Sequence, residues 1–165
     1  MKVIDDLLSE KEFKGIQKII EDKNFPWYFV DGKSYAGDGS YQMSHTFVEL
    51  GKVISKMYKI NYPVLSKLNV HKILRIKANI TFKKPTNEQS PMHVDYEFPE
   101  KTKYKTAVFY CNTNNGSTLF QNGKRVYSKE NRLVVFDGHQ KHCGVDCTDK
   151  VRRIVINYVY TEKEK

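Results

Sequence analysis

His93-Val94-Asp95 is the segment of this sequence whose residue types are best suited to chemistry. In an extended chain, residues two apart point to the same face about 6.5 Å apart, so an imidazole and a carboxylate can bind one cation. A histidine from a distant segment would complete a set of two histidines and one carboxylate, which leaves several positions of a ferrous ion open. His139 and His142 are the candidates for that third ligand. Alone, His-x-Asp is weak, because the same residues commonly make structural hydrogen bonds.

The elements that must position these residues differ between the two parts of the chain. Ser9 and Glu12 have the spacing of a capping box, and apolar residues at helical intervals then predict a helix that ends before Pro26. An aromatic strand is expected over 25–30, a loop over 31–43, and further helical segments over 47–58 and 63–68. From Val70 onward the apolar residues alternate, and the predicted strands are 73–82, 104–110, 117–121, 124–127, 132–137 and 152–160.

These patterns predict an α+β protein in which antiparallel strands form a sandwich or distorted barrel backed by N-terminal helices. Asn122-Gly123 lies between two of the strands and is typical of a tight hairpin. We expect one domain over residues 1–165, with a helical part over about 1–68 and a β core over about 70–160. Residues 161–165 are expected to be a solvated tail.

The composition favours a cytoplasmic protein that meets anionic partners. Lys and Arg number 28 against 19 acidic residues, for a net charge of +9, but they are scattered as on ordinary solvated surfaces. Three cysteines, Cys111, Cys143 and Cys147, argue against a disulfide framework. No apolar stretch approaches the length of a membrane span, and no glycine-rich phosphate loop indicates nucleotide chemistry.

Several motifs occur in an order that resembles the 2-oxoglutarate and Fe(II)-dependent dioxygenase superfamily. His93-Val94-Asp95 is followed by Tyr110-Cys-Asn-Thr-Asn-Asn-Gly116, then by Asn131-Arg-Leu-Val-Val-Phe-Asp-Gly138, a histidine, and paired arginines that open the last strand. The sequence is most similar to the prolyl-4-hydroxylase-like branch and to small phage-encoded relatives, over about residues 73–160. Phe25-Pro-Trp-Tyr28 also resembles a frequent feature of these proteins.

The resemblance implies a double-stranded β-helix of the jelly-roll or cupin type and an oxygenase that uses Fe(II), 2-oxoglutarate and dioxygen. His93, Asp95 and His142 would bind the iron. His142 is preferred to His139 because the family's distal histidine often precedes a small residue and a glycine, as in His142-Cys-Gly144. The expected reaction is hydroxylation of a peptidyl, prolyl-like residue or of a small molecule, with release of succinate and carbon dioxide.

The cosubstrate needs a cation for its far carboxylate, and Arg153 is the candidate, because a guanidinium forms two parallel hydrogen bonds with a carboxylate. The resemblance places Arg153 inward with Val155 and Asn157, and Arg152 outward. Tyr110 matches a family tyrosine whose hydroxyl also meets that carboxylate. Asn79 or Arg75, on the strand 73–82, could reach the same centre from the opposite side.

Two other interpretations remain open from the sequence. A structural zinc site could use the cluster His139, His142, Cys143 and Cys147, although adjacent ligands on an extended chain would point apart. A non-catalytic basic β-sandwich could instead bind nucleic acid or an acidic partner through its charge and exposed tyrosines. His45 and His71 are expected to make surface or helix-end contacts, and Cys111 to be a small buried residue.

Overall fold

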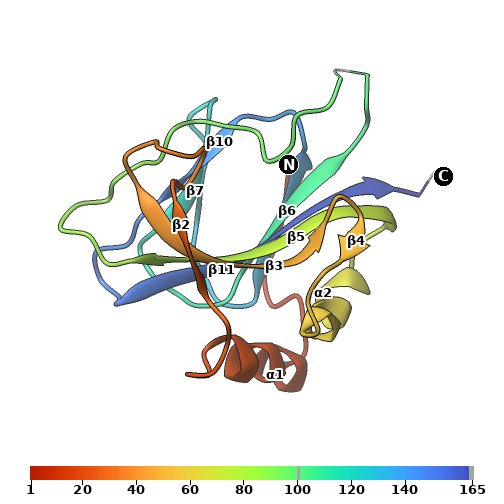
Figure 1. Cartoon of the computed structure of the whole chain (residues 1–165), viewed down its shortest axis with the longest axis horizontal. Helices are drawn as coiled ribbons and strands as arrows, with labels where there is room; N and C mark the ends of the chain where they lie inside the picture. Colours follow the sequence, from red (N-terminus) through yellow and green to blue (C-terminus); the bar gives the residue numbers. More distant parts are fainter. Residues whose placement is uncertain (100, 164–165) are drawn as a thin grey trace.

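Two antiparallel sheets form the body of the protein, shown in Figure 1. The computed structural model describes residues 1–99 and 101–163. The large sheet has the order β1-β9-β6-β11-β5-β3-β2, with β4 paired to β3, and the small sheet has the order β10-β7-β8. The strands are β1 Lys2–Ile4, β2 Tyr28–Asp31, β3 Tyr41–Glu49, β4 Lys52–Val53, β5 Val70–Phe82, β6 Lys105–Tyr110, β7 Ser117–Phe120, β8 Arg125–Tyr127, β9 Arg132–Asp137, β10 His142–Val145 and β11 Arg152–Glu162.

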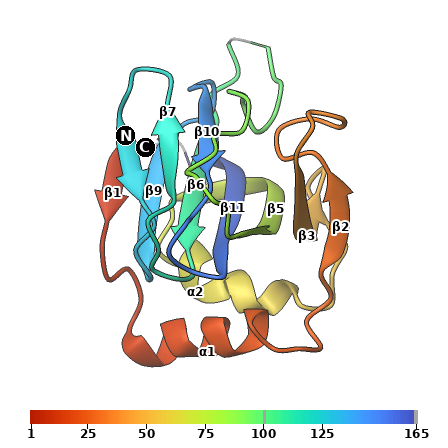
Figure 2. The same cartoon turned by 90° about the vertical axis from the view of Figure 1, so that its left-hand side faces the viewer.

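The three helical elements are α1 (Glu10–Ile20), the short 3₁₀ turn η1 (Tyr58–Asn61) and α2 (Tyr62–Leu65). The predicted capping box starts α1, since the Ser9 hydroxyl accepts from the Glu12 amide and the Glu12 carboxylate accepts from the Ser9 amide. In Figures 1 and 2, α1 lies on the side of the large sheet away from β7 and β10. The helix therefore covers one face of that sheet and leaves the other to the small sheet.

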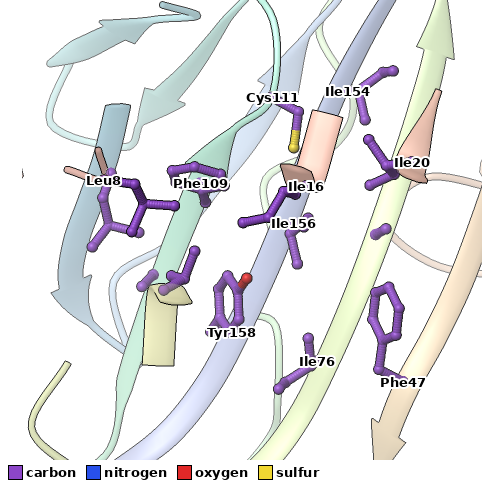
Figure 3. Packing of buried hydrophobic residues seen from close by; sticks show 14 of the residues in the cluster. Leu8, Ile16, Ile20, Phe47, Ile76, Phe109, Cys111, Ile154, Ile156 and Tyr158 are labelled. Atoms are coloured by element: carbon purple, nitrogen blue, oxygen red, sulfur yellow. The ribbon is translucent and has the colours of Figure 1, made fainter. Parts of the chain in front are cut away.

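Alternation along the central strands gives the large sheet two different faces. On β5, Ile76, Ala78 and Ile80 belong to the main core beside α1, together with Ile154 and Ile156 of β11. Figure 3 shows this cluster, in which side chains of α1 meet those of the sheet. The intervening residues of β5 and β11 face the small sheet, and they are the more polar set.

The expected α+β architecture of antiparallel strands is confirmed, but the helix expected over 47–58 is wrong. Residues 47–49 complete β3, and the chain then reverses through Leu50 and Gly51, which have positive φ angles of 51° and 75°. Val53 and Ile54, which belong to the apolar stripe of the expected helix, are exposed. The apolar spacing there reflects two antiparallel strands and their turn.

Other differences concern short segments. The strands β1 and β10 were not predicted, because three or four residues give too little alternation to recognise. His45 is buried, with its ring nitrogens near the Pro26 carbonyl (2.8 Å) and the Ser55 hydroxyl (2.7 Å), so the expected surface contact is wrong. Thr161 and Glu162 extend β11, whereas residues 164–165 of the expected tail lie outside the described residues.

Across residues 1–99 and 101–163, every helix is too short or too polar to cross a membrane.

The packing of α1 on the large sheet is expected to dominate stability. Phe109 is fully buried and meets Phe13 of α1 edge-on, with ring centroids 6.1 Å apart. Phe109→Ala should lower the free energy of unfolding in urea by about 3–5 kcal/mol, because it removes the ring and leaves a cavity. Phe29→Ala, at a site that is 67% exposed, is the control and should change it by no more than about 0.5 kcal/mol. Equal effects would contradict this assignment of the core.

Candidate active site

His93, Asp95 and His142 come together at one end of the small sheet. β10 begins at His142, and the segment that carries His93 pairs with it through two backbone hydrogen bonds, His93 N to His142 O (2.9 Å) and His142 N to His93 O (3.0 Å). One ligand atom from each of the three residues lies within 4.8 Å of the other two. Ligands 2.0–2.2 Å from a metal ion lie about 3–4 Å apart. The three atoms are therefore close to the spacing that a single bound ion requires.

Both histidine rings are oriented as metal ligands. The Nδ1 of His93 lies 3.0 Å from the Pro91 carbonyl oxygen, and the Nδ1 of His142 lies 3.1 Å from the Gln140 carbonyl oxygen. A carbonyl accepts only, so Nδ1 carries the proton in each neutral ring and Nε2 keeps a free electron pair. Burial lowers the pKa of His93 despite the nearby Asp95 carboxylate, which favours the neutral ring that a metal requires.

Asp95 is held as a carboxylate by hydrogen-bond donors from both central strands. Arg75 of β5 donates to Oδ1 (2.9 Å), and the amide of Asn157 on β11 donates to Oδ2 (2.9 Å). Burial alone would raise the pKa of Asp95, but hydrogen bonding from the protonated His142 ring and the nearby positive charges outweigh it and lower the pKa. Burial likewise opposes protonation of His142, whose Nε2 lies 3.3 Å from Oδ2, yet the Asp95 carboxylate raises the pKa of His142.

Arg75 therefore acts on the site by positioning Asp95. Arg75→Met should weaken Fe(II) binding about 10–100-fold, which is the usual cost of losing a group that orients a metal ligand. The measurement is a competition titration with a ferrous chelator under anaerobic conditions. Arg125→Met, on the opposite sheet, is the control and should keep the wild-type affinity. Unchanged binding in Arg75→Met would show that Asp95 needs no such support.

The alternative ligands lie elsewhere. The Nε2 of His139 lies 2.9 Å from the Thr102 carbonyl oxygen, and its ring packs on Tyr104. The Cys147 thiol donates to the Lys150 carbonyl (3.3 Å), and Cys143 alternates with His142 on β10, so the two side chains point to opposite faces. Within residues 1–99 and 101–163, the only group of three metal-binding side chains is His93, Asp95 and His142. The zinc interpretation has no geometric support in this part of the chain.

Arg153 is buried at the other end of the same cavity. Its Nε donates to the Ser128 hydroxyl (2.9 Å), one terminal nitrogen lies 3.4 Å from the Thr118 hydroxyl, and the guanidinium lies 5.6 Å from the Tyr110 ring centroid. No carboxylate oxygen of the described residues lies within 4.0 Å of it. Arg152, in contrast, points outward to Glu21 (3.5 Å). A buried guanidinium without an acidic partner is suited to bind an anionic ligand.

The motif from Tyr110 to Gly116 explains how Arg153 is held. The Asn112 side chain donates to the Arg152 carbonyl (2.8 Å) and accepts from the Ile154 amide (2.9 Å), so it fixes the backbone on both sides of Arg153. Gly116 leaves room for the arginine, since a Cβ there would lie 2.8 Å from the Arg153 Cδ. The motif therefore positions the arginine, a role that the sequence alone did not reveal.

Asn79 lines the cavity, whereas Tyr110 does not. The Tyr110 hydroxyl donates to the Thr118 hydroxyl oxygen (2.8 Å), and Tyr110 lies behind the wall while Thr118 lines it. With its oxygen already accepting, the Thr118 hydroxyl can donate to a ligand. Asn79 lines the cavity from β5, and its Oδ1 is buried with no hydrogen-bond partner among the described residues. Sequence reasoning missed Thr118 because an isolated threonine carries no signal.

One cavity of about 140 Å³ connects these groups. Its walls come from β5, β11 and β10, and its mouth lies under the loop between β2 and β3. That loop is fixed across the mouth by an ion pair between Lys33 and the buried Asp146 and by a hydrogen bond from the Ser34 hydroxyl to the Pro91 carbonyl (2.8 Å). The three candidate metal ligands and Arg153 thus line a single, partly open cavity.

Comparison with known proteins gives matches in structure only. No family model and no curated protein matches the sequence. The structure matches the viral collagen prolyl hydroxylase of Paramecium bursaria Chlorella virus-1, solved as a 2-oxoglutarate complex, with TM-score 0.63 and 13% identity over 98% of this chain and 96% of that one. The chain has the fold of the 2-oxoglutarate and Fe(II) oxygenases. The expected double-stranded β-helix and the resemblance seen in the sequence are thereby confirmed at the level of the fold.

Two further matches show how varied proteins with this oxygenase fold are. A Trichoplax adhaerens prolyl hydroxylase in complex with a hypoxia inducible factor peptide fragment has TM-score 0.67 and 10% identity, over 96% of this chain and 82% of that one. The α-ketoglutarate-dependent carbocyclase SnoK from nogalamycin biosynthesis has TM-score 0.68 and 13% identity, over 97% of this chain and 78% of that one. One is in complex with a peptide fragment, and the other comes from nogalamycin biosynthesis.

Proposed function

We propose that this oxygenase-fold protein is a non-haem dioxygenase that uses Fe(II), 2-oxoglutarate and dioxygen to hydroxylate a second substrate, with release of succinate and carbon dioxide. The observation that carries the proposal is the arrangement of three ligand atoms within 4.8 Å of one another beside a cavity that ends at Arg153, a buried arginine with no carboxylate partner among the described residues. A metal centre and a carboxylate anchor in one cavity are what a bound 2-oxoacid requires. A cytoplasmic location suits three cysteines that are all free thiols.

The donor set fits a ferrous ion. His93 and His142 would bind through Nε2 and Asp95 through its carboxylate, a set of two histidines and one carboxylate that suits iron(II) and leaves positions open. The bound ion would supply the activation of dioxygen, while the protein's own groups orient the reactants. Arg75 and Asn157 fix the Asp95 carboxylate, and the Pro91 and Gln140 carbonyls fix the two imidazoles.

The cosubstrate would lie between the metal centre and Arg153. Arg153 would bind its far carboxylate, with a further hydrogen bond from Thr118, because among the described residues it is the cation at that end of the cavity that lacks an acidic partner. Tyr110 would support this contact through Thr118, and a direct bond from its hydroxyl would require that hydroxyl to leave Thr118. Asn79 would face the cosubstrate from β5, and the contact would require its amide NH₂ group to donate to a cosubstrate oxygen. The loop over the mouth would limit access of water.

The second substrate is a peptidyl residue, prolyl-like, or a small molecule. The matched prolyl hydroxylases favour a peptide and the matched carbocyclase a small molecule. The β2–β3 loop and residues 85–92 would contact this substrate, because they border the mouth of the cavity.

An anaerobic titration tests the proposed function. Protein with Fe(II) should develop the visible metal-to-ligand charge-transfer band when 2-oxoglutarate is added, and admission of oxygen should then yield succinate. If the band and the succinate are both absent, and polyanions bind tightly with a steep salt dependence, the protein is a binding module instead. Thermal stability with and without Fe(II) and 2-oxoglutarate gives a second readout, since ligands that bind the folded state raise it.

A further inference from the structure

More cations than carboxylates line the cavity, and among the described residues Lys77 is one of the cations without a carboxylate partner. Four cations and two carboxylates line it: Lys33, Arg75, Lys77, Arg153, Asp95 and Asp146. Lys33 pairs with Asp146, and Arg75 pairs with Asp95 at 2.9 Å. No carboxylate oxygen of the described residues lies within 4.0 Å of the ammonium group of Lys77 or of the guanidinium of Arg153. The cavity therefore holds two cations without acidic partners.

Lys77 lies beside the candidate metal ligands, away from Arg153. It is in register with Asn157, which binds Asp95, whereas Arg153 is in register with Thr81 four residues further along β5. Four residues of a strand span about 13 Å. Burial, and next the charge of Arg75, lower the pKa of Lys77, and Asp95 and Glu49 only partly oppose them. An anion near Lys77 would relieve this unbalanced charge.

The two carboxylates of a bound 2-oxoglutarate molecule would already have partners of opposite charge other than Lys77. In the proposed function, its two carboxylates are occupied by the metal and by Arg153. Resting on that function, we infer that Lys77 binds a carboxylate of the second substrate, so that this substrate is a carboxylic acid. A single ammonium group balances the single charge of a carboxylate, whereas a phosphate with a charge near −2 would remain partly unbalanced in a buried site.

Acetate is the simplest probe of this subsite. Protein loaded anaerobically with Fe(II) and saturated with 2-oxoglutarate should bind acetate, detected by saturation-transfer NMR of the methyl signal. It should bind neutral acetamide more weakly by the same signal, and inorganic phosphate should displace acetate poorly in competition. Lys77→Gln should weaken acetate binding about tenfold or more, the size expected for a lost hydrogen bond to a charged group. Its affinity for 2-oxoglutarate should stay near that of the wild type. Lys72→Gln removes an exposed lysine from the same strand and should leave acetate binding unchanged.

Each contrary result is distinct. Acetate that fails to bind the wild type, or that binds Lys77→Gln equally well, would overturn the inference, as would tighter binding of phosphate. A large loss of 2-oxoglutarate affinity in Lys77→Gln would assign Lys77 to the cosubstrate and would equally overturn it. The charge-transfer band of the same samples distinguishes failure of this inference from failure of the proposed function. A band without acetate binding would overturn the carboxylate subsite alone. Absence of the band would remove the proposed function and this inference with it.

Discussion

His142→Ala should abolish tight Fe(II) binding and, with it, the 2-oxoglutarate charge-transfer band and succinate formation. The ring contributes one of three ligand atoms that lie within 4.8 Å of one another. Loss of an outer group that orients a ligand costs about 10–100-fold in metal affinity, so loss of a ligand itself should cost more than 100-fold. His93→Ala and Asp95→Ala should behave in the same way. Anaerobic chelator competition measures the affinity directly.

His139→Ala is the matched control for this prediction. It removes the other histidine of the same turn, three residues away, whose ring contacts the Thr102 carbonyl and Tyr104. We expect wild-type iron affinity and an intact charge-transfer band, with at most a modest loss of stability. Far-UV circular dichroism should show that all the alanine variants are folded. Loss of iron in His139→Ala with retention in His142→Ala would reverse the assignment of the third ligand.

Arg153→Met should raise the 2-oxoglutarate concentration needed for half-maximal signal about 30-fold or more while leaving iron binding intact. Methionine keeps an unbranched apolar side chain in the buried site but removes the guanidinium that would meet the far carboxylate. Removing one partner of a buried, hydrogen-bonded charge pair costs about 2–5 kcal/mol, which sets the size of the effect. The measurement is a titration of the charge-transfer band, backed by KM for 2-oxoglutarate in the succinate assay.

Arg152→Met controls for the loss of positive charge at this position of the strand. Arg152 lies outside the cavity and pairs with Glu21 at 3.5 Å, so its removal should change 2-oxoglutarate affinity by less than about twofold. Arg153→Lys refines the result, since a lysine keeps the charge but loses the planar pair of donors. Its affinity for 2-oxoglutarate should lie between those of Arg153→Met and the wild type. A near wild-type KM in Arg153→Met would move the anchor to another cation of the cavity, with Lys77 the first to examine.

The sequence predicted those parts of the site that depend on short spacing. His93 and Asp95 are two residues apart, and the resemblance to the oxygenases implied that Arg153 faces inward and Arg152 outward, which is where the structure has them. Alternation puts Arg75, Lys77 and Asn79 on one face of β5, so the analysis of that strand that gave Arg75 and Asn79 could have identified Lys77 as well. What it could not predict is that Arg75 meets Asp95, because that contact depends on the path of the 83–92 segment.

The fold was predictable where strands are long and failed where apolar residues are spaced ambiguously. β5, β6, β9 and β11 follow their predicted ranges closely, since each has six residues or more and is rich in β-branched or aromatic residues. The stretch 47–58 gave a false helix, because a bulge between Thr46 and Val48 and the turn at Gly51 shift the apolar residues of two strands into helical spacing. Local periodicity cannot separate these cases without knowledge of which strands pair.

Anomalous diffraction at the iron absorption edge tests the central claim most directly. Crystals of protein loaded anaerobically with Fe(II) and 2-oxoglutarate should show one iron peak, within bonding distance of the Nε2 atoms of His93 and His142 and of the Asp95 carboxylate. Electron density for 2-oxoglutarate should extend from this peak to Arg153. A peak bound by His139 or by Cys143 and Cys147, or fully loaded crystals with no ordered iron at the three residues, would contradict the account.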